Sequence, residues 1–307
     1  MIRGGWRTGM LMALVAACIL AVAACGGDDD GEATTASGTP APVAAVQDDH
    51  LPVDPVETVP DRVALIAATG ATVTRVDFFW SDIARERPAA PRDPGDAAYD
   101  WTRTDLTMRE LEKAGITPIV SVYNSPVWAT DAPAPEPGIA VNTNAPDPDD
   151  FADFMAAVAT RYAGDFTPAG GDGPLPAVTR FELWNEPNLP GFLTPQVEDG
   201  RRVSLDNYAA MVKAAYPAVK EANPDTIVIA GVAGPRSSSS DTGTGAMEWL
   251  RGLQERDIPL DAYSQHIYPA AAPTAETDVV PSWGTIGTML DALDGFERGL
   301  PLYITEA

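Results

Sequence analysis

The sequence predicts an α/β fold, a (β/α)8 TIM barrel that is C-terminally incomplete, with about seven strands present. Short runs of β-branched and aromatic residues alternate with amphipathic helical segments along the chain, as in a parallel sheet covered by helices. The loops after the second, third and fourth strands are long, and in a barrel they open on the face that carries active sites. No glycine-rich phosphate turn follows any strand, which disfavours the competing doubly wound sheet.

The predicted strands are near-continuous apolar runs, as expected where helices cover a parallel sheet. The first strand is weak, whereas the second is rich in β-branched and aromatic residues. The seven strands cover residues 43–46, 72–80, 116–123, 178–184, 226–230, 261–267 and 302–305.

The predicted helices carry apolar residues three and four positions apart, which gives each helix one face to pack against the sheet. Gly70 and Gly115 end the first two helices. Asp149 and Asp150 stand at the start of the third, where negative charge suits the helix dipole. The six helices cover residues 54–69, 105–114, 151–162, 205–222, 245–256 and 285–297.

Composition narrows the classes of function. Of the 307 residues, 45% are hydrophobic and 21% are charged, as in an ordinary globular protein. The formal charge of −24 disfavours binding to nucleic acid, because phosphate backbones would be repelled. Two histidines and two cysteines are too few for a histidine-rich hydrolytic metal centre or a zinc ribbon. We expect no metal and no organic cofactor.

The first 24 residues have the pattern of a signal peptide. Arg3 and Arg7 precede an uncharged run over residues 10–24, which is shorter than the roughly 20 residues of a membrane-spanning helix. The run leads to Cys25 and resembles a bacterial lipobox, in which the cysteine thiol becomes lipidated. The alternative is an ordinary secretory signal followed by an incidental cysteine.

The chain after the signal divides into two parts. Residues 25–43 are rich in small and polar residues and predict a flexible, acidic tether. Residues 44–307 form the predicted barrel. We expect an extracytoplasmic protein that is lipid-anchored to the bacterial cell membrane through Cys25, or secreted.

Two glutamates lie where predicted strands end. The segment Trp-Asn-Glu-Pro places Glu186 just past the fourth strand, and Glu306 follows the seventh. Side chains alternate along a strand, so Leu302, Ile304 and Glu306 share one side and Glu306 should face the barrel mouth. A single glutamate would read as a solvated loop residue, but two carboxylates at these strand ends indicate acid–base chemistry.

On these motifs the chain resembles the retaining glycoside hydrolases of the (β/α)8 superfamily, whose carboxylates follow strands four and seven. The resemblance is to cellulase-like family 5 and xylosidase-like family 39 members, and it covers roughly residues 44–307. It implies that Glu186 is the general acid/base and Glu306 the nucleophile, with the carboxyls ~5–5.5 Å apart. It further implies that Asn185 hydrogen-bonds the sugar 2-hydroxyl.

The resemblance also assigns positions around the nucleophile. The second strand is similar to the family's arginine strand and implies that Arg75 lies inside the mouth, near Glu306. Glu182 shares its strand parity with Glu186 and is a candidate partner for Arg75. On the sixth strand, His266 and Tyr268 match the family's His-x-Tyr pair, in which the tyrosine touches the nucleophile.

Aromatic residues at strand ends are candidate platforms for the CH faces of sugar rings. Trp80, Trp128 and Trp283 qualify by position, although packing roles are an equal alternative for each. One position departs from the family pattern, because Asn124 stands where many relatives carry a histidine at the end of the third strand. We expect Asn124 to face the substrate.

The sequence as a whole predicts a retaining glycoside hydrolase that cleaves O-glycosidic bonds of a polysaccharide or oligosaccharide by double displacement. The alternative is a non-catalytic carbohydrate-binding lipoprotein on the same barrel, but a binder would have no reason to keep both glutamates. A metal-dependent barrel hydrolase fails on the number of histidines. The printed sequence stops one residue after Glu306, so we expect a longer gene product that supplies the eighth strand, and a poorly stable, largely inactive protein without it.

Overall fold

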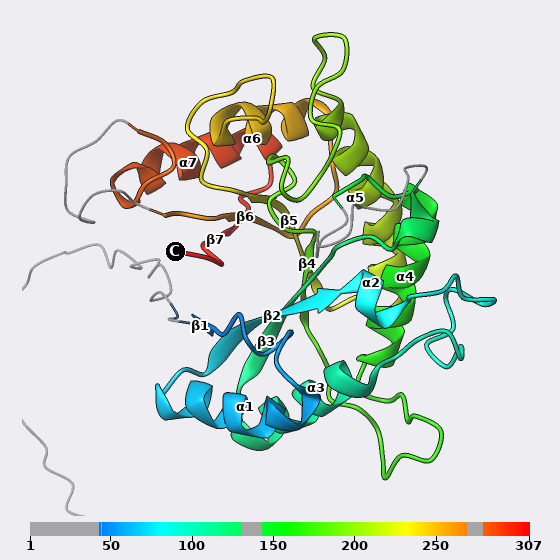
Figure 1. Ribbon diagram of the computed structural model, residues 1–307. Helices are drawn as coiled ribbons and strands as arrows, with labels where there is room; N and C mark the ends of the chain where they lie inside the picture. Colours follow the sequence, from blue (N-terminus) through cyan, green and yellow to red (C-terminus); the bar gives the residue numbers. More distant parts are fainter. Residues whose placement is uncertain (1–42, 44, 131–142, 269–278) are drawn as a thin grey trace, which may run out of the picture. The chain divides into compact units, whose positions relative to one another are not determined.

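The computed structural model describes residue 43 and residues 45–130, 143–268 and 279–307. Over these residues, seven parallel strands form one curled sheet in which each strand pairs with the next along the chain (Figure 1). The strands are β1 Val46–Gln47, β2 Val73–Phe79, β3 Thr117–Tyr123, β4 Arg180–Leu183, β5 Ile227–Ala233, β6 Ala262–Gln265 and β7 Leu302–Tyr303.

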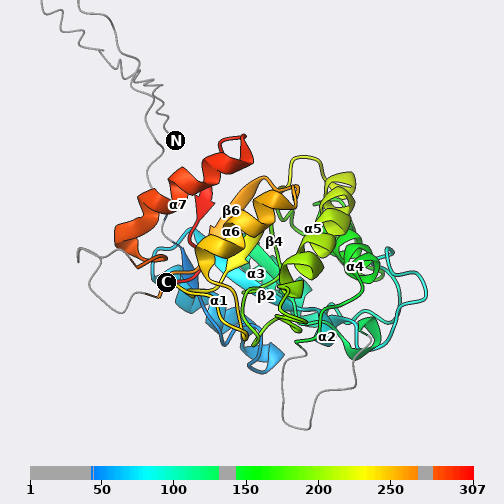
Figure 2. The same cartoon turned by 90° about the horizontal axis from the view of Figure 1, so that it is seen from above.

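Helices connect consecutive strands and lie outside the curled sheet, as the view from above shows (Figure 2). The α-helices are α1 Val59–Ala68, α2 Trp80–Ile83, α3 Thr102–Ala114, α4 Pro148–Arg161, α5 Val203–Ala222, α6 Ala246–Glu255 and α7 Ile286–Leu293. Short 3-10 turns are η1 Val56–Thr58, η2 Val127–Ala129, η3 Trp283–Thr285 and η4 Asp294–Phe296. This arrangement confirms the predicted incomplete barrel, with seven strands and a helix in each of the six connections.

Element boundaries differ from the sequence expectation at several places. The first strand lies later than residues 43–46, because Val46 and Gln47 pair with Thr74 and Arg75 of β2. Trp80 does not end β2 but starts α2, a short helix that the sequence pattern did not predict. The predicted helix over residues 285–297 is shorter, since α7 gives way to a 3-10 turn.

The predicted signal peptide, Cys25 and almost all of the tether lie outside the described residues. Within the described segments, none of the helices combines the length and the apolar character that crossing a membrane would require.

Local sequence explains where the helices around the site begin and end. Asp147 caps α4, because its carboxylate accepts hydrogen bonds from the backbone N–H groups of Asp149 at 2.8 Å and Asp150 at 3.3 Å. Gly115 ends α3 in a left-handed conformation with φ 70°. Asp147 therefore marks the end of the loop between β3 and α4, and Gly115 marks the start of the short connection from α3 to β3.

Strand β5 contains a bulge next to the residues that hold the backbone of His266. Its pairing with β6 shifts register between Ala230 and Ala233, and the two residues between them, Gly231 and Val232, have φ values of 89° and 35°. Positive φ is costly for a β-branched residue such as Val232. The bulge turns the backbone carbonyl of Ala233 towards β6, where it accepts a hydrogen bond from the N–H of His266 at 2.9 Å.

We expect Gly231→Ala to lower the free energy of unfolding by roughly 2–4 kcal/mol, because strain and overpacking add. An added Cβ would lie 2.3 Å from a ring carbon of Tyr263, in a left-handed conformation. Gly70→Ala is the matched control, with φ 81° but no atom within 4 Å of its Cβ, and should cost only about 1 kcal/mol. Denaturant unfolding followed by circular dichroism measures both, and equal losses would contradict the proposed clash.

Candidate active site

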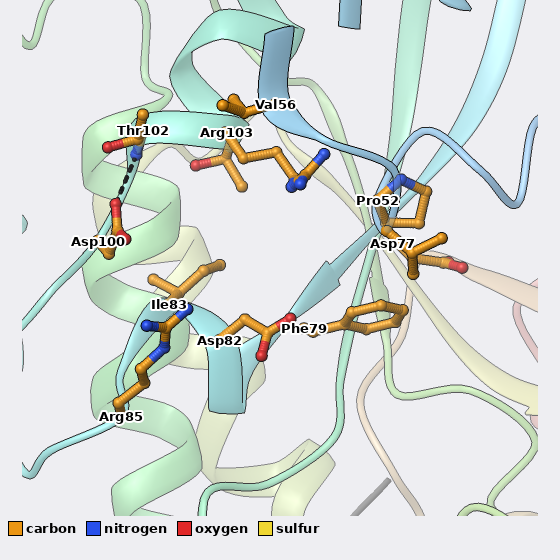
Figure 3. A pocket seen from close by; sticks show the side chains of 12 residues that line it. Pro52, Val56, Asp77, Phe79, Asp82, Ile83, Arg85, Asp100, Thr102 and Arg103 are labelled. Atoms are coloured by element: carbon orange, nitrogen blue, oxygen red, sulfur yellow. Dashed lines mark hydrogen bonds between the residues drawn. The ribbon is translucent and has the colours of Figure 1, made fainter. Parts of the chain in front are cut away.

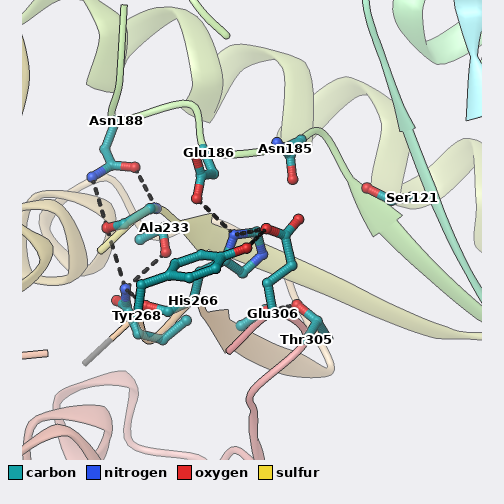
Figure 4. Close-up of polar contacts among 12 residues, drawn as sticks. Ser121, Asn185, Glu186, Asn188, Ala233, His266, Tyr268, Thr305 and Glu306 are labelled. Atoms are coloured by element: carbon teal, nitrogen blue, oxygen red, sulfur yellow. Dashed lines mark hydrogen bonds and ion pairs between the residues drawn. The ribbon is translucent and has the colours of Figure 1, made fainter. Parts of the chain in front are cut away.

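The candidate site lies at the carboxyl ends of the strands, where the chain turns from strand to loop. Glu186 follows β4, His266 follows β6 and Glu306 follows β7, and their side chains converge (Figure 4). The backbone N–H of Ile267 donates to the carbonyl of Glu306 at 2.9 Å, so strand-like pairing continues past β7 as far as Glu306. This pairing holds a residue near the printed end of the sequence in the site.

His266 stands between the two glutamates. Its ring is fully buried, and Nδ1 lies 2.9 Å from Oε1 of Glu186 and 3.4 Å from Oε2 of Glu306. One side-chain ligand atom of each of the three residues lies within 4.8 Å of the others. The imidazole can therefore exchange a hydrogen bond with Glu186 in either tautomer, while it keeps the two carboxylates apart.

The loop after β4 holds Glu186 in an unusual backbone conformation. Trp184 and Glu186 have φ values of 77° and 40°, a region that costs energy for residues other than glycine. The indole N–H of Trp184 donates to the carbonyl of Phe192 at 2.9 Å, which anchors the loop in the core. Gly234 faces this loop closely, since an added Cβ would lie 3.0 Å from the carboxyl carbon of Glu186.

Arg75 lies at the centre of a second, buried network. Its guanidinium donates to Oε2 of Glu182 at 2.6 Å and to Oε1 of Glu306 at 2.7 Å. It also donates to Oδ1 of Asn185 at 2.6 Å and to Ser121 Oγ at 2.9 Å. The contact between Arg75 and Glu182, which strand parity predicts, is thus confirmed.

The charges in this network support one another. Burial alone would lower the pKa of Arg75, but the surrounding carboxylates raise it above its ordinary value. Burial alone would raise the pKa of Glu182, but the Arg75 guanidinium and then His266 lower it below its ordinary value. Both groups are therefore charged at neutral pH, in a region almost without solvent contact.

Tyr268 contacts the second oxygen of Glu306. Its hydroxyl donates to Oε2 at 2.5 Å, although 55% of the residue surface is exposed. Partial burial and then this hydrogen bond raise the pKa of Tyr268, which keeps the hydroxyl protonated as a donor. Both carboxylate oxygens of Glu306 thus accept hydrogen bonds, one from Arg75 and one from Tyr268 (Figure 4).

Asp77 is a site residue that the sequence reasoning missed. It lies two residues after Arg75 on β2, on the same face, with Oδ1 3.0 Å from the Arg75 guanidinium and Oδ2 accepting from the Tyr123 hydroxyl at 3.1 Å. Burial raises the pKa of Asp77 to about 6, against the opposing effect of Arg75. Its alternation with Arg75 was the signal that could have found it.

The three candidate tryptophan platforms have different surroundings. Trp80 is wrong as a platform, because its side chain is fully buried and stacks on Phe154 at 5.2 Å between ring centroids. Trp128 lines a different cavity of about 550 Å3, with the guanidinium of Arg87 4.7 Å from its ring centre. Trp283 is 37% exposed in η3.

Asn124 and Asn185 are both buried, and each makes a defined hydrogen bond. Asn124 is buried directly after β3 with φ 68°, and its backbone carbonyl accepts from the N–H of Ser81 at 2.9 Å. Asn185 uses its Oδ1 on Arg75, which orients its amide group. For Asn124, as for Trp283, contact with a substrate stays a prediction.

Glu186, His266 and Glu306 are also the residues that could hold a metal ion, by the proximity of their ligand atoms. Their existing partners argue for a different use. The Arg75 guanidinium already neutralises Glu306 at 2.7 Å, and a divalent cation there would be repelled by it. The arrangement instead suits a pair of carboxylates acting on opposite sides of one bond.

Comparison with models of known protein families finds no match, and neither does comparison with curated proteins. Solved structures do match. A family 39 β-xylosidase from Caulobacter crescentus superposes with a TM-score of 0.57 at 19% identity, covering 85% of this chain and 52% of its own. A glucosidase from Croceicoccus marinus gives 0.55 at 16% identity, covering 79% and 46%.

A family 39 glycoside hydrolase from the gut symbiont Bacteroides cellulosilyticus gives a TM-score of 0.52 at 20% identity, covering 85% of this chain and 47% of its own. The chain therefore spans about half the length of the solved structures it matches. At these identities the likeness establishes the barrel fold, and the assignment of a reaction depends on the site residues themselves.

We expect Asp77→Asn to reduce the dependence of stability on pH. The folded state holds the Asp77 proton more tightly than the unfolded state, so wild-type stability falls as pH rises from about 4 through the folded pKa of about 6. The variant lacks this loss, so its free energy of unfolding at pH 7 should exceed that of the wild type by on the order of 2 kcal/mol. Denaturant unfolding between pH 4 and 8 measures it.

Asp225→Asn, at an exposed position just before β5, is the control and should follow the wild type at every pH. If the free energy of unfolding varies with pH in the same way for Asp77→Asn and the wild type, Asp77 is not protonated in the folded state across this range.

Proposed function

We propose that this chain carries the active site of a retaining glycoside hydrolase that cleaves O-glycosidic bonds in a polysaccharide or oligosaccharide. One observation carries the proposal. Glu186 and Glu306, from the ends of β4 and β7, present carboxylate oxygens within 4.8 Å of each other, beside His266. This separation supports the ~5–5.5 Å spacing of retaining enzymes over the ~6.5–9.5 Å that inverting enzymes need for a water.

In the first step Glu306 attacks the anomeric carbon of the sugar, and the bond from that carbon to the glycosidic oxygen breaks. Glu186, carrying a proton, transfers it to the departing oxygen. The product of this step is a glycosyl ester on Glu306 and a free alcohol. His266 Nδ1, 2.9 Å from Glu186, accepts or donates a hydrogen bond as that carboxyl changes its protonation.

In the second step Glu186, now ionised, removes a proton from water, and the water oxygen attacks the anomeric carbon. The ester bond to Glu306 breaks and the carboxylate is regenerated. Arg75 and Tyr268, at 2.7 Å and 2.5 Å, stabilise that carboxylate as the leaving group. Asn185 is oriented by Arg75 and can offer its amide N–H groups to the sugar 2-hydroxyl.

The matched solved structures suggest which substrates to test first. They include a β-xylosidase and a glucosidase, so β-linked xylose and glucose units are the first candidates for this chain. The competing proposal, a non-catalytic carbohydrate-binding protein, uses the same fold but gives no reason for Glu186 to be held in a costly backbone conformation.

We expect azide to restore turnover of an activated aryl β-glycoside in two variants and to give products of opposite anomeric configuration. In Glu186→Ala, azide replaces water in the second step and yields a β-glycosyl azide. In Glu306→Ala, azide attacks the substrate directly and yields the α-glycosyl azide. Each variant without azide should lose at least about a hundredfold in turnover of unactivated substrates. NMR of the products, with chelator-treated wild type as a control for metal dependence, makes the measurement.

Wild-type turnover of an unactivated polysaccharide or oligosaccharide by Glu186→Ala, or the same azide anomer from both variants, would overturn the assignment. Carbohydrate binding without any hydrolysis by the wild-type protein would favour the non-catalytic alternative.

We also propose that the protein is extracytoplasmic and lipid-anchored, on the evidence of the basic and apolar residues before Cys25. In a bacterial host, the wild-type chain should incorporate a fatty-acid probe and sediment with membranes. Cys25→Ser should do neither. Labelling that persists in Cys25→Ser, or a wild-type protein released without label, would contradict the anchor.

A further inference from the structure

A cavity of about 370 Å3 opens beside the candidate active site, between the segment before α1, the end of β2, α2 and the start of α3 (Figure 3). Its volume is in the range of small-molecule binding pockets. The residues that matter here are Val53, Asp77, Phe79, Asp82, Arg85 and Arg103. None of the site residues that the sequence predicts lines this cavity.

Asp77 joins the cavity to the site. Its side chain is only 9% exposed, and its Oδ1 lies 3.0 Å from the same guanidinium nitrogen of Arg75 that donates to Glu306 at 2.7 Å. Oδ1 is buried and accepts no hydrogen bond from the described residues, although its charge faces Arg75. Asp77 therefore connects the lining of the cavity to the guanidinium that holds Glu306.

The positions of the two glutamates indicate on which side of the cleaved bond the cavity lies. Glu306 is tied through Arg75 to Asp77 on β2, at the side of the cavity. Glu186 instead contacts His266 after β6 and faces Gly234 after β5. In a double displacement the leaving group departs beside the acid, Glu186, and the retained sugar stays on the nucleophile. The cavity therefore lies on the side of the retained sugar.

The lining has the chemistry of a sugar site. Asp82 and Arg85 are exposed, and Asp82 makes no hydrogen bond or ion pair with the part of the chain that the structure describes. Both line the cavity together with the ring of Phe79 (Figure 3). Carboxylate and guanidinium groups hydrogen-bond sugar hydroxyls, and an aromatic ring can pack against the CH face of a sugar.

We propose that this cavity is a second sugar subsite, which binds the unit preceding the one attached to Glu306. The inference rests on the proposed function and adds to it a preference for substrates with at least two sugars on the non-reducing side of the cleaved bond. Asp77 then lies between the two sugar units, because it pairs with the Arg75 guanidinium that holds Glu306 and it also lines the cavity.

Matched aryl glycosides test the preference. We expect the wild type to hydrolyse 4-nitrophenyl β-xylobioside or β-cellobioside with a kcat/KM at least roughly tenfold above that for the corresponding monosaccharide glycoside, as two or more added hydrogen bonds would give. Val53 is 59% exposed at the rim, and Val53→Trp should fill the cavity and bring this ratio towards one. Asp82→Asn should lower the ratio roughly threefold or more.

Asp225→Asn, at the opposite ends of the strands, is the control and should leave the ratio unchanged. The proposal fails if the wild type shows no preference for the disaccharide glycoside. It also fails if Val53→Trp and Asp82→Asn lose activity equally on both substrates.

A binding experiment separates this inference from the proposed function. If the wild-type chain hydrolyses none of the glycosides, the proposed function fails, and xylobiose and cellobiose are titrated into it with NMR detection. Binding that is tighter than for xylose or glucose, and that Val53→Trp abolishes, supports the subsite without catalysis. Absence of such binding, or binding that Val53→Trp leaves intact, overturns the subsite.

Discussion

The buried guanidinium of Arg75 is the interaction on which the site depends. A cation with almost no solvent contact is stable only where carboxylates and hydrogen-bond acceptors surround it. Arg75 finds those acceptors on β1, β3, β4 and past β7, including Glu182 and Glu306. The contact with Glu306 joins residues 231 positions apart in the sequence. Arg75 thus ties Glu306 to side chains on β1, β3 and β4.

The backbone is strained in the loop after β4 and in the bulge of β5. Glu186 and Val232 both have positive φ, and such conformations persist only where surrounding structure over-determines them. Asn188 supplies part of that support, because its amide group bonds the N–H of Gly234 at 2.7 Å and the carbonyl of Thr244 at 2.9 Å. The close approach of Gly234 to Glu186 explains why a residue without a side chain stands there.

The sequence predicts the fold from alternating strand and helix patterns, and strand parity predicts which side chains share a face, whereas the places of Arg75, His266 and Tyr268 come from the family resemblance. Arg75 and Glu182 were predicted to meet on that rule, and they do. Trp80 was misjudged because the strand pattern does not show that α2 begins there and turns the ring into the core. Asp77 was overlooked because an acidic residue on a strand reads as ordinary, and its isolation from water depends on tertiary burial. Periodicity gives the face a residue occupies, but depth below the surface depends on the loops that cover it.

Charge in the site also bears on the proposed chemistry. Around one guanidinium, that of Arg75, stand the carboxylates of Asp77, Glu182 and Glu306, with Glu186 beside His266. The local balance is therefore acidic, even with Glu186 carrying a proton. Fixed negative charge in a site shielded from water favours the positive charge that develops on the sugar in an oxocarbenium-like transition state. Because Arg75 offsets part of this charge, Glu306 is held in place without its neighbours being driven apart by mutual repulsion.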